Sequence, residues 1–108
     1  MSSSPVRWKG RSVVVLGMGK SGVAAAKLLH SLGAEVIVND RKKRSECPEA
    51  EELERMGIRV ILGGHPPSLF DGNIELMVKN PGIPYRIPPV REALRRGIPV
   101  VTEVEIAA

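Results

Sequence analysis

A helical stretch that ends at a glycine and leads directly into an apolar strand occurs three times in this sequence. The glycines are Gly33, Gly57 and Gly97, and the residues that follow them are rich in Val and Ile. Glycine is typical of the position just after a helix C-terminus, where the backbone adopts a positive φ. Strands that alternate with helices favour right-handed βαβ units. The sequence therefore predicts an α/β fold with a mostly parallel sheet.

Short apolar segments supply the expected strands of this sheet. Their apolar residues are continuous rather than alternating, which is typical of strands covered on both faces, and predicts a three-layer domain. Residues 63–73 leave room only for a short helical turn between two strands. A chain of 108 residues is enough for one domain, with residues 1–10 as a tail and entry segment. The five expected strands are residues 13–16, 36–38, 60–62, 74–78 and 99–101.

The first expected strand leads into a glycine-rich loop, Gly-Met-Gly-Lys-Ser-Gly at 17–22, which opens a helix. In a G-x-G-x-x-G loop the first glycine, here Gly17, permits a tight turn. The second, Gly19, lets the backbone approach a phosphate, and the third, Gly22, allows close packing. Backbone N–H groups and the helix dipole then hold the anion. Because Asp40 also closes the second strand, the pattern predicts a Rossmann-like nucleotide-binding domain.

A second loop is expected to face the glycine loop. In a Rossmann-like strand order the first and fourth strands are neighbours, and the ligand lies beyond their carboxyl ends. The fourth strand ends in Lys-Asn-Pro-Gly-Ile-Pro at 79–84, so Asn80 either bonds to its own turn or contacts a ligand. A Walker A loop would need a glycine where Val14 stands, so the chain carries no evident ATP-hydrolysing loop.

Composition and charge argue against other classes of function. The net charge of +4 suits an anionic partner, but the aromatic residues Trp8, Phe70 and Tyr85 are too scattered to suggest nucleic-acid binding. A lone cysteine, Cys47, excludes an internal disulfide and fits a cytoplasmic setting. No apolar run approaches about 18 residues, so we expect neither a signal peptide nor a membrane span. His65 lacks a second ligand at metal spacing and reads as structural or exposed.

Four segments together resemble the Mur ligase family, and within it the members that add D-glutamate. The resemblance implies an ATP-dependent ligase of peptidoglycan synthesis that joins D-glutamate to UDP-N-acetylmuramoyl-L-alanine through an acyl-phosphate. Similar enzymes have three domains: the first holds the UDP part of the substrate, and the other two bind ATP, magnesium and D-glutamate. The segments are VVVLGMGKSG at 13–22, VND at 38–40, KNPGIP at 79–84 and GIPVVTEVE at 97–105.

The resemblance identifies residues 1–108 with the first domain alone, so we expect the central and C-terminal domains to be missing partners. Lys20 and Ser21 match positions that meet the diphosphate, and Asp40 matches the acid that meets uracil. No position matches a catalytic residue, so we expect this segment alone to be inactive and to hold neither cofactor nor metal. The residues expected to bind UDP are Gly17, Gly19, Lys20, Ser21, Gly22, Asp40, Arg41, Lys42, Asn80, Pro81 and Gly82.

Two other functions fit the same residues. A G-x-G-x-x-G loop followed by an acid is also typical of an NAD(P)-binding domain of a dehydrogenase, and Arg41 beside Asp40 would suit NADP. A nucleotide-sensing module that regulates a partner without chemistry would need the same loop. The sequence leaves both alternatives open.

Overall fold

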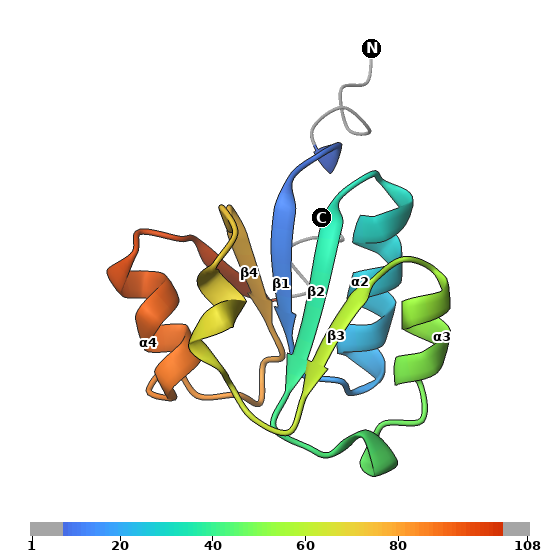
Figure 1. The fold of residues 1–108 in the computed structure, drawn as a ribbon. Helices are drawn as coiled ribbons and strands as arrows, with labels where there is room; N and C mark the ends of the chain where they lie inside the picture. The colour runs from blue at the N-terminus through green and yellow to red at the C-terminus, as the bar shows by residue number, and fades with distance from the viewer. Residues whose placement is uncertain (1–7, 103–108) are drawn as a thin grey trace.

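The computed structural model describes residues 8–102 (Figure 1). Residues 1–7 of the expected tail and residues 103–105 of the last motif lie outside that range. The strands are β1 (Ser12–Leu16), β2 (Glu35–Asp40), β3 (Arg59–Leu62), β4 (Leu76–Lys79) and β5 (Val100–Thr102). The α-helices are α2 (Lys20–Ser31), α3 (Ala50–Arg55) and α4 (Pro88–Arg95), and the short 3₁₀ turns are η1 (Arg44–Glu46) and η2 (Pro67–Phe70).

The five strands form one sheet in the order β3-β2-β1-β4-β5, and every neighbouring pair is parallel. The predicted α/β, Rossmann-like architecture is confirmed, as is the short helical turn between β3 and β4. The fourth strand begins at Leu76 rather than at Ile74, because Ile74 packs into the core ahead of the ladder. β1 lies at the centre, between β2 and β4, as the expected strand order requires.

Two apolar cores lie on the two faces of the sheet. Alternate residues of β1 divide between them: Val13 and Val15 pack with α2 and α3, whereas Val14 and Leu16 pack with η2 and α4. Figure 1 shows α2 and α3 on one side of the sheet and α4 on the other. Because each fully buried Val or Leu contributes about 1.5–3 kcal/mol, these two cores hold the strands in place. The expected three layers are confirmed.

The three helix-ending glycines all have positive φ: +95° at Gly33, +99° at Gly57 and +76° at Gly97. In each case the residue after the glycine donates its N–H to a carbonyl five residues back, which is the Schellman motif. The chain therefore turns sharply out of each helix toward the sheet. The three bonds are Ala34 N to Leu29 O, Ile58 N to Leu53 O and Ile98 N to Ala93 O, at 3.0, 3.0 and 2.9 Å. Among residues 8–102, no helix is long and apolar enough to cross a membrane.

Candidate nucleotide-binding site

The glycine loop between β1 and α2 is held by a hydrogen bond to β2 and by close packing between its first and third glycines. Gly17 has a φ of +110°, and its N–H donates to the carbonyl of Asn39 at 2.8 Å. A Cβ at Gly22 would lie 2.0 Å from the carbonyl oxygen of Gly17. Gly17 therefore makes the tight turn, and Gly22, which has no side chain, lets that turn pack closely against α2, as predicted.

The middle of the loop is open. Gly19 is the N-cap of α2 and is exposed, and a Cβ there would meet only the Nδ2 of Asn80, at an ordinary 3.5 Å. No side chain caps this helix end, and its first turn contains no acidic residue. Because the first N–H groups of a helix carry partial positive charge, this end is suited to an anion.

Asp40 at the end of β2 holds the glycine loop in place. Its Oδ2 accepts a hydrogen bond from the N–H of Met18 at 2.8 Å, and its Oδ1 accepts one from the N–H of Lys42 at 2.9 Å. This bracing role was not evident from the sequence, where Asp40 was expected only to contact a ligand. Since each carboxylate oxygen has a second lone pair, both roles are compatible.

Asn39 and His65 form a second polar pair behind Asp40. Asn39 is completely buried, and its Oδ1 lies 2.6 Å from the Nδ1 of His65. The Asn39 Nδ2 donates to the carbonyls of Ile61 and Gly64 at 2.9 and 2.8 Å, which fixes the end of β3 beside the end of β2. Burial lowers the pKa of His65, while Asp40 acts to raise it and Arg41 to lower it.

The loop after β4 faces the glycine loop, as predicted. A Cβ at Gly17 would lie 3.3 Å from the Cβ of Asn80 and 3.2 Å from the Cδ1 of Ile83. The Asn80 Oδ1 accepts a hydrogen bond from the N–H of Gly82 at 3.0 Å, so the turn interpretation of Asn80 is confirmed. Its amide nitrogen remains directed toward Gly19.

Lys79 supports this second loop from beneath. Its side chain is buried, and its Nζ lies 3.4 Å from the carbonyl oxygen of Asn80 and 4.5 Å from the ring centroid of Tyr85. A cation over an aromatic face is attracted by the ring quadrupole. Lys79 therefore helps to fix the loop and does not line the cavity described next.

A cavity of about 640 Å³ lies between these loops, beyond the carboxyl ends of β1, β2 and β4. Seven of the expected UDP-binding residues line it, and four do not. Lys20 and Ser21 are exposed in the first turn of α2, Pro81 is exposed in its turn, and Gly22 is buried under the loop. The seven expected residues that line the cavity are Gly17, Gly19, Asp40, Arg41, Lys42, Asn80 and Gly82.

Sequence reasoning missed three polar residues of the cavity, Asn39, His65 and Arg86. His65 was expected to be structural or exposed, and its position beside Asp40 results from the pairing of β2 with β3. With Arg86, the lining contains three fixed cations, Arg41, Lys42 and Arg86, against one carboxylate, Asp40. The cavity therefore favours an anionic ligand. In residues 8–102, no cluster of three or more His, Cys, Asp or Glu residues could hold a metal ion.

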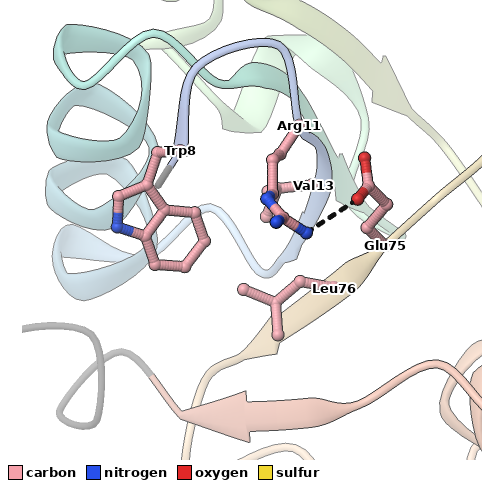
Figure 2. A pocket seen from close by; sticks show the side chains of 5 residues that line it. All are labelled: Trp8, Arg11, Val13, Glu75 and Leu76. Atoms are coloured by element: carbon pink, nitrogen blue, oxygen red, sulfur yellow. Dashed lines mark hydrogen bonds and ion pairs between the residues drawn. The ribbon is translucent and has the colours of Figure 1, made fainter. Parts of the chain in front are cut away.

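A second cavity, of about 230 Å³, lies at the opposite end of the same strands (Figure 2). Its wall is Trp8, Arg11, Val13, Glu75 and Leu76, and an ion pair joins the Arg11 Nη1 to the Glu75 Oε1 at 2.9 Å. Ligands of open parallel sheets bind at the carboxyl ends of the strands. This cavity at the amino ends lies away from the glycine loop, and among residues 8–102 no helix N-terminus belongs to its wall.

The parallel sheet, the glycine loop between β1 and α2 and the acid at the end of β2 together define a domain of the Rossmann type. Residues 11–102 match the family described as "Mur ligase MurD-like, N-terminal domain". The chain belongs to this family. The match includes all strands of the described sheet and both loops of the larger cavity.

Curated relatives are similar over almost the whole chain. The UDP-N-acetylmuramoylalanine--D-glutamate ligase of Geobacillus sp. (strain WCH70) is 58% identical over 100 residues, which is 93% of this chain and 22% of that protein. The protein of the same name from Enterococcus faecalis gives the same identity and the same coverage. The chain thus spans about a fifth of the length of these relatives.

Solved structures share the fold at lower identity. The A chain of dipicolinate synthase from Bacillus subtilis has a TM-score of 0.61 and 18% identity, and covers 88% of this chain and 38% of that one. CAD from Helicobacter pylori, complexed with NADP(H), has a TM-score of 0.53 and 25% identity over 71% of this chain and 22% of that one. The first likeness shows the fold alone.

Proposed function

We propose that this chain is the uridine-nucleotide-binding domain of a ligase that adds D-glutamate to UDP-N-acetylmuramoyl-L-alanine in peptidoglycan synthesis. The observation that carries the proposal is the cationic cavity at the open glycine loop, in a chain of the MurD-like family. The similar relatives bear the name of that ligase. The enzyme would act in the cytoplasm, where it would serve the cell wall, cell shape and cell division.

The diphosphate would lie over the first turn of α2. Its oxygens would accept hydrogen bonds from the uncapped N–H groups there, and the exposed Lys20 and Ser21 side chains would reach it from the solvent side. Arg41 and Lys42 on the cavity wall would add positive charge. Asn80, Pro81 and Gly82 would bound the ligand from the opposite loop.

The uracil ring would lie beside Asp40. An ionised carboxylate only accepts hydrogen bonds, and uracil has a donor at N3 where cytosine has an acceptor. Asp40 keeps one lone pair on each oxygen after its bonds to Met18 and Lys42. This arrangement would favour uracil over cytosine.

The chemical step would need the central and C-terminal domains. We propose that ATP, magnesium and D-glutamate bind there and that the acyl-phosphate forms there. Residues 8–102 contain no metal-binding cluster, and 17–22 is a G-x-G-x-x-G loop without the Walker A spacing. The chain alone should therefore form no peptide bond, and turnover of ATP that depends on D-glutamate would contradict this assignment.

The alternative is an NAD(P)-binding domain of a dehydrogenase, or a nucleotide-sensing module of the same fold. It is favoured by the likeness to a protein that was solved with NADP(H) and by Arg41 beside Asp40. The family match argues against it. In a dinucleotide complex Asp40 would hold ribose hydroxyls and would not select the base.

Calorimetric titration of the chain with UDP, UDP-N-acetylmuramoyl-L-alanine, NAD and NADP separates these functions. We expect both uridine ligands to bind at the same site and the two dinucleotides to give no saturable heat. Tighter binding of NAD or NADP than of UDP would overturn the proposed function.

A further inference from the structure

The buried amide of Asn39 can be oriented in only one way. Its Nδ2 lies within hydrogen-bond distance of two carbonyl oxygens, those of Ile61 and Gly64, and a carbonyl oxygen can only accept. The amino group of Asn39 must therefore point at these carbonyls. Its Oδ1, which is an acceptor, then points at the Nδ1 of His65, 2.6 Å away.

This geometry fixes the position of the proton on the His65 ring. Because the Asn39 Oδ1 accepts, the Nδ1 of His65 must carry the hydrogen, and the neutral ring then has a bare lone pair on Nε2. Within the described part of the chain, the only hydrogen bond of this ring runs through Nδ1. Burial lowers the pKa of His65, which favours the neutral ring near pH 7.

His65 lies in the wall of the larger cavity with Asp40 and Arg41. Both oxygens of Asp40 already accept backbone N–H groups, whereas the Nε2 of His65 has no such partner in residues 8–102. Elsewhere the cavity wall is rich in donors, from the loop N–H groups and from Arg41, Lys42 and Arg86. His65 therefore offers a hydrogen-bond acceptor that is already in place, in a site whose other polar groups are mainly hydrogen-bond donors.

We propose that His65 is a ligand-binding residue of this site, whose Nε2 accepts a hydrogen bond from an N–H or O–H donor of the bound nucleoside. Asn39 is the positioning residue that holds the ring in the accepting tautomer. The inference rests on the proposed function and extends it, because it assigns a second acceptor for the nucleoside beside Asp40. Uridine offers two kinds of donor for it, the N3–H of the base and the ribose hydroxyls.

The test is an NMR titration of the two histidines, His30 and His65, in the ¹⁵N-labelled chain, with and without saturating uridine. Uridine is uncharged, so it does not raise an imidazole pKa by attraction. An accepting Nε2 should bind uridine about three- to tenfold more tightly when neutral than when protonated. By linkage, uridine should lower the pKa of His65 by the corresponding factor, below the value that burial, Asp40 and Arg41 set in the free chain.

His30 on α2 is the internal control, because it does not line the cavity and uridine should leave its ring signals in place. The ring ¹⁵N shifts of neutral His65 should also show the proton on Nδ1. Repeating the titration with 3-methyluridine separates the two kinds of donor, since the pKa change disappears with this analogue if the N3–H of the base is the donor and persists if a ribose hydroxyl is. An unchanged or raised pKa of His65 with uridine bound, or a proton on Nε2, would overturn the inference.

A parallel titration with UDP keeps the two proposals distinguishable. If UDP binds and the pKa of His65 does not fall with uridine, the proposed function stands and the role of His65 is wrong. If neither UDP nor uridine binds, the proposed function fails, and the inference fails with it.

Discussion

The two ends of β1 and β4 carry polar groups that differ in whether they are already paired. At the amino ends, Arg11 is paired with Glu75, and the backbone N–H of Glu75 donates to the carbonyl of Ser12. At the carboxyl ends, the first turn of α2 has no side-chain cap, and the Nε2 of His65 has no hydrogen-bond partner among residues 8–102. The cavity there is also the larger, at about 640 Å³ against about 230 Å³.

The difference shows how one sheet can have a closed end, at the amino ends of β1 and β4, and a proposed binding end, at their carboxyl ends. Both ends are built on the same apolar strands, so the strands do not decide the chemistry. The loops decide it, because a βα unit places a helix N-terminus at the carboxyl end of its strand, where the first N–H groups of the helix have no partner within the helix. At that end, Asp40 and Asn39 form hydrogen bonds that fix the neighbouring loops in place.

The largest effect on stability is expected at Gly22, where the glycine loop packs against the start of α2. Gly22→Ala places a Cβ 2.0 Å from the carbonyl of Gly17, a backbone atom that cannot move without opening the loop. The variant should lose about 3 kcal/mol or more of unfolding free energy. Urea denaturation measures this, with Gly19→Ala as the matched control at an ordinary contact distance. Equal stability of the two variants would contradict the loop geometry.

The second-largest effect is expected on UDP affinity at Gly19, and it separates the packing role of the glycine loop from its proposed binding role. Gly19→Val adds a side chain on the exposed face where the diphosphate would approach, so UDP affinity should fall by about a hundredfold or more, roughly 3 kcal/mol. The fold should persist, with a stability loss near 1 kcal/mol for a branched residue at an N-cap. Calorimetry with circular dichroism checks both values. A folded variant with undiminished affinity would show that the loop only packs.

The preference for uracil over cytosine tests the role of Asp40 at the proposed binding end. If Asp40 faces the base, UDP should bind better than CDP by about 1–3 kcal/mol, the usual cost of an unpaired buried polar group. Asp40→Asn should reduce that preference, because its amide can donate to cytosine. Since the same change also disturbs the bond to the Met18 N–H, the ratio of the two affinities is the informative quantity. Equal binding of UDP and CDP by the unmutated chain would support ribose contact and the dinucleotide alternative.

The smallest effect is expected at the amino ends. Arg11→Gln removes an ion pair whose side chains are 54% and 35% exposed, so stability should change by only about 0–1 kcal/mol. UDP affinity should stay within about twofold of the unmutated value, since the pair is not part of the nucleotide cavity. A marked loss of UDP binding in this variant would show that the two ends are not independent.

Features that depend on local backbone chemistry could be predicted from the sequence. The helix-ending glycines at Gly33, Gly57 and Gly97 have the positive φ that their position requires. The roles of Gly17 and Gly22 follow from the same local geometry, and continuous apolar runs indicated a sheet covered on both faces. Strand boundaries were less exact, because Ile74 is as apolar as a strand residue but packs outside the ladder.

Features that depend on distant pairing could not be predicted. The bond between Asn39 and His65 joins residues 26 apart, and it forms because β2 and β3 end side by side. Arg86 reaches the cavity through the path of the loop after β4, which no spacing rule specifies. Asp40 was expected from its position at the end of the second strand, but its bond to the loop N–H of Met18 depends on the folded turn. The UDP contacts of the expected residues remain predictions.

The most direct test of the account is to map where UDP binds. In a ¹H,¹⁵N correlation spectrum of the chain titrated with UDP, the largest shifts should occur at the amides of Gly19, Lys20 and Ser21, where the helix end is uncapped. The amides of Arg11 and Glu75, at the closed end, should stay unchanged. Largest shifts at Arg11 and Glu75, or none at the glycine loop at saturating UDP, would contradict the claim that the carboxyl end is the nucleotide site.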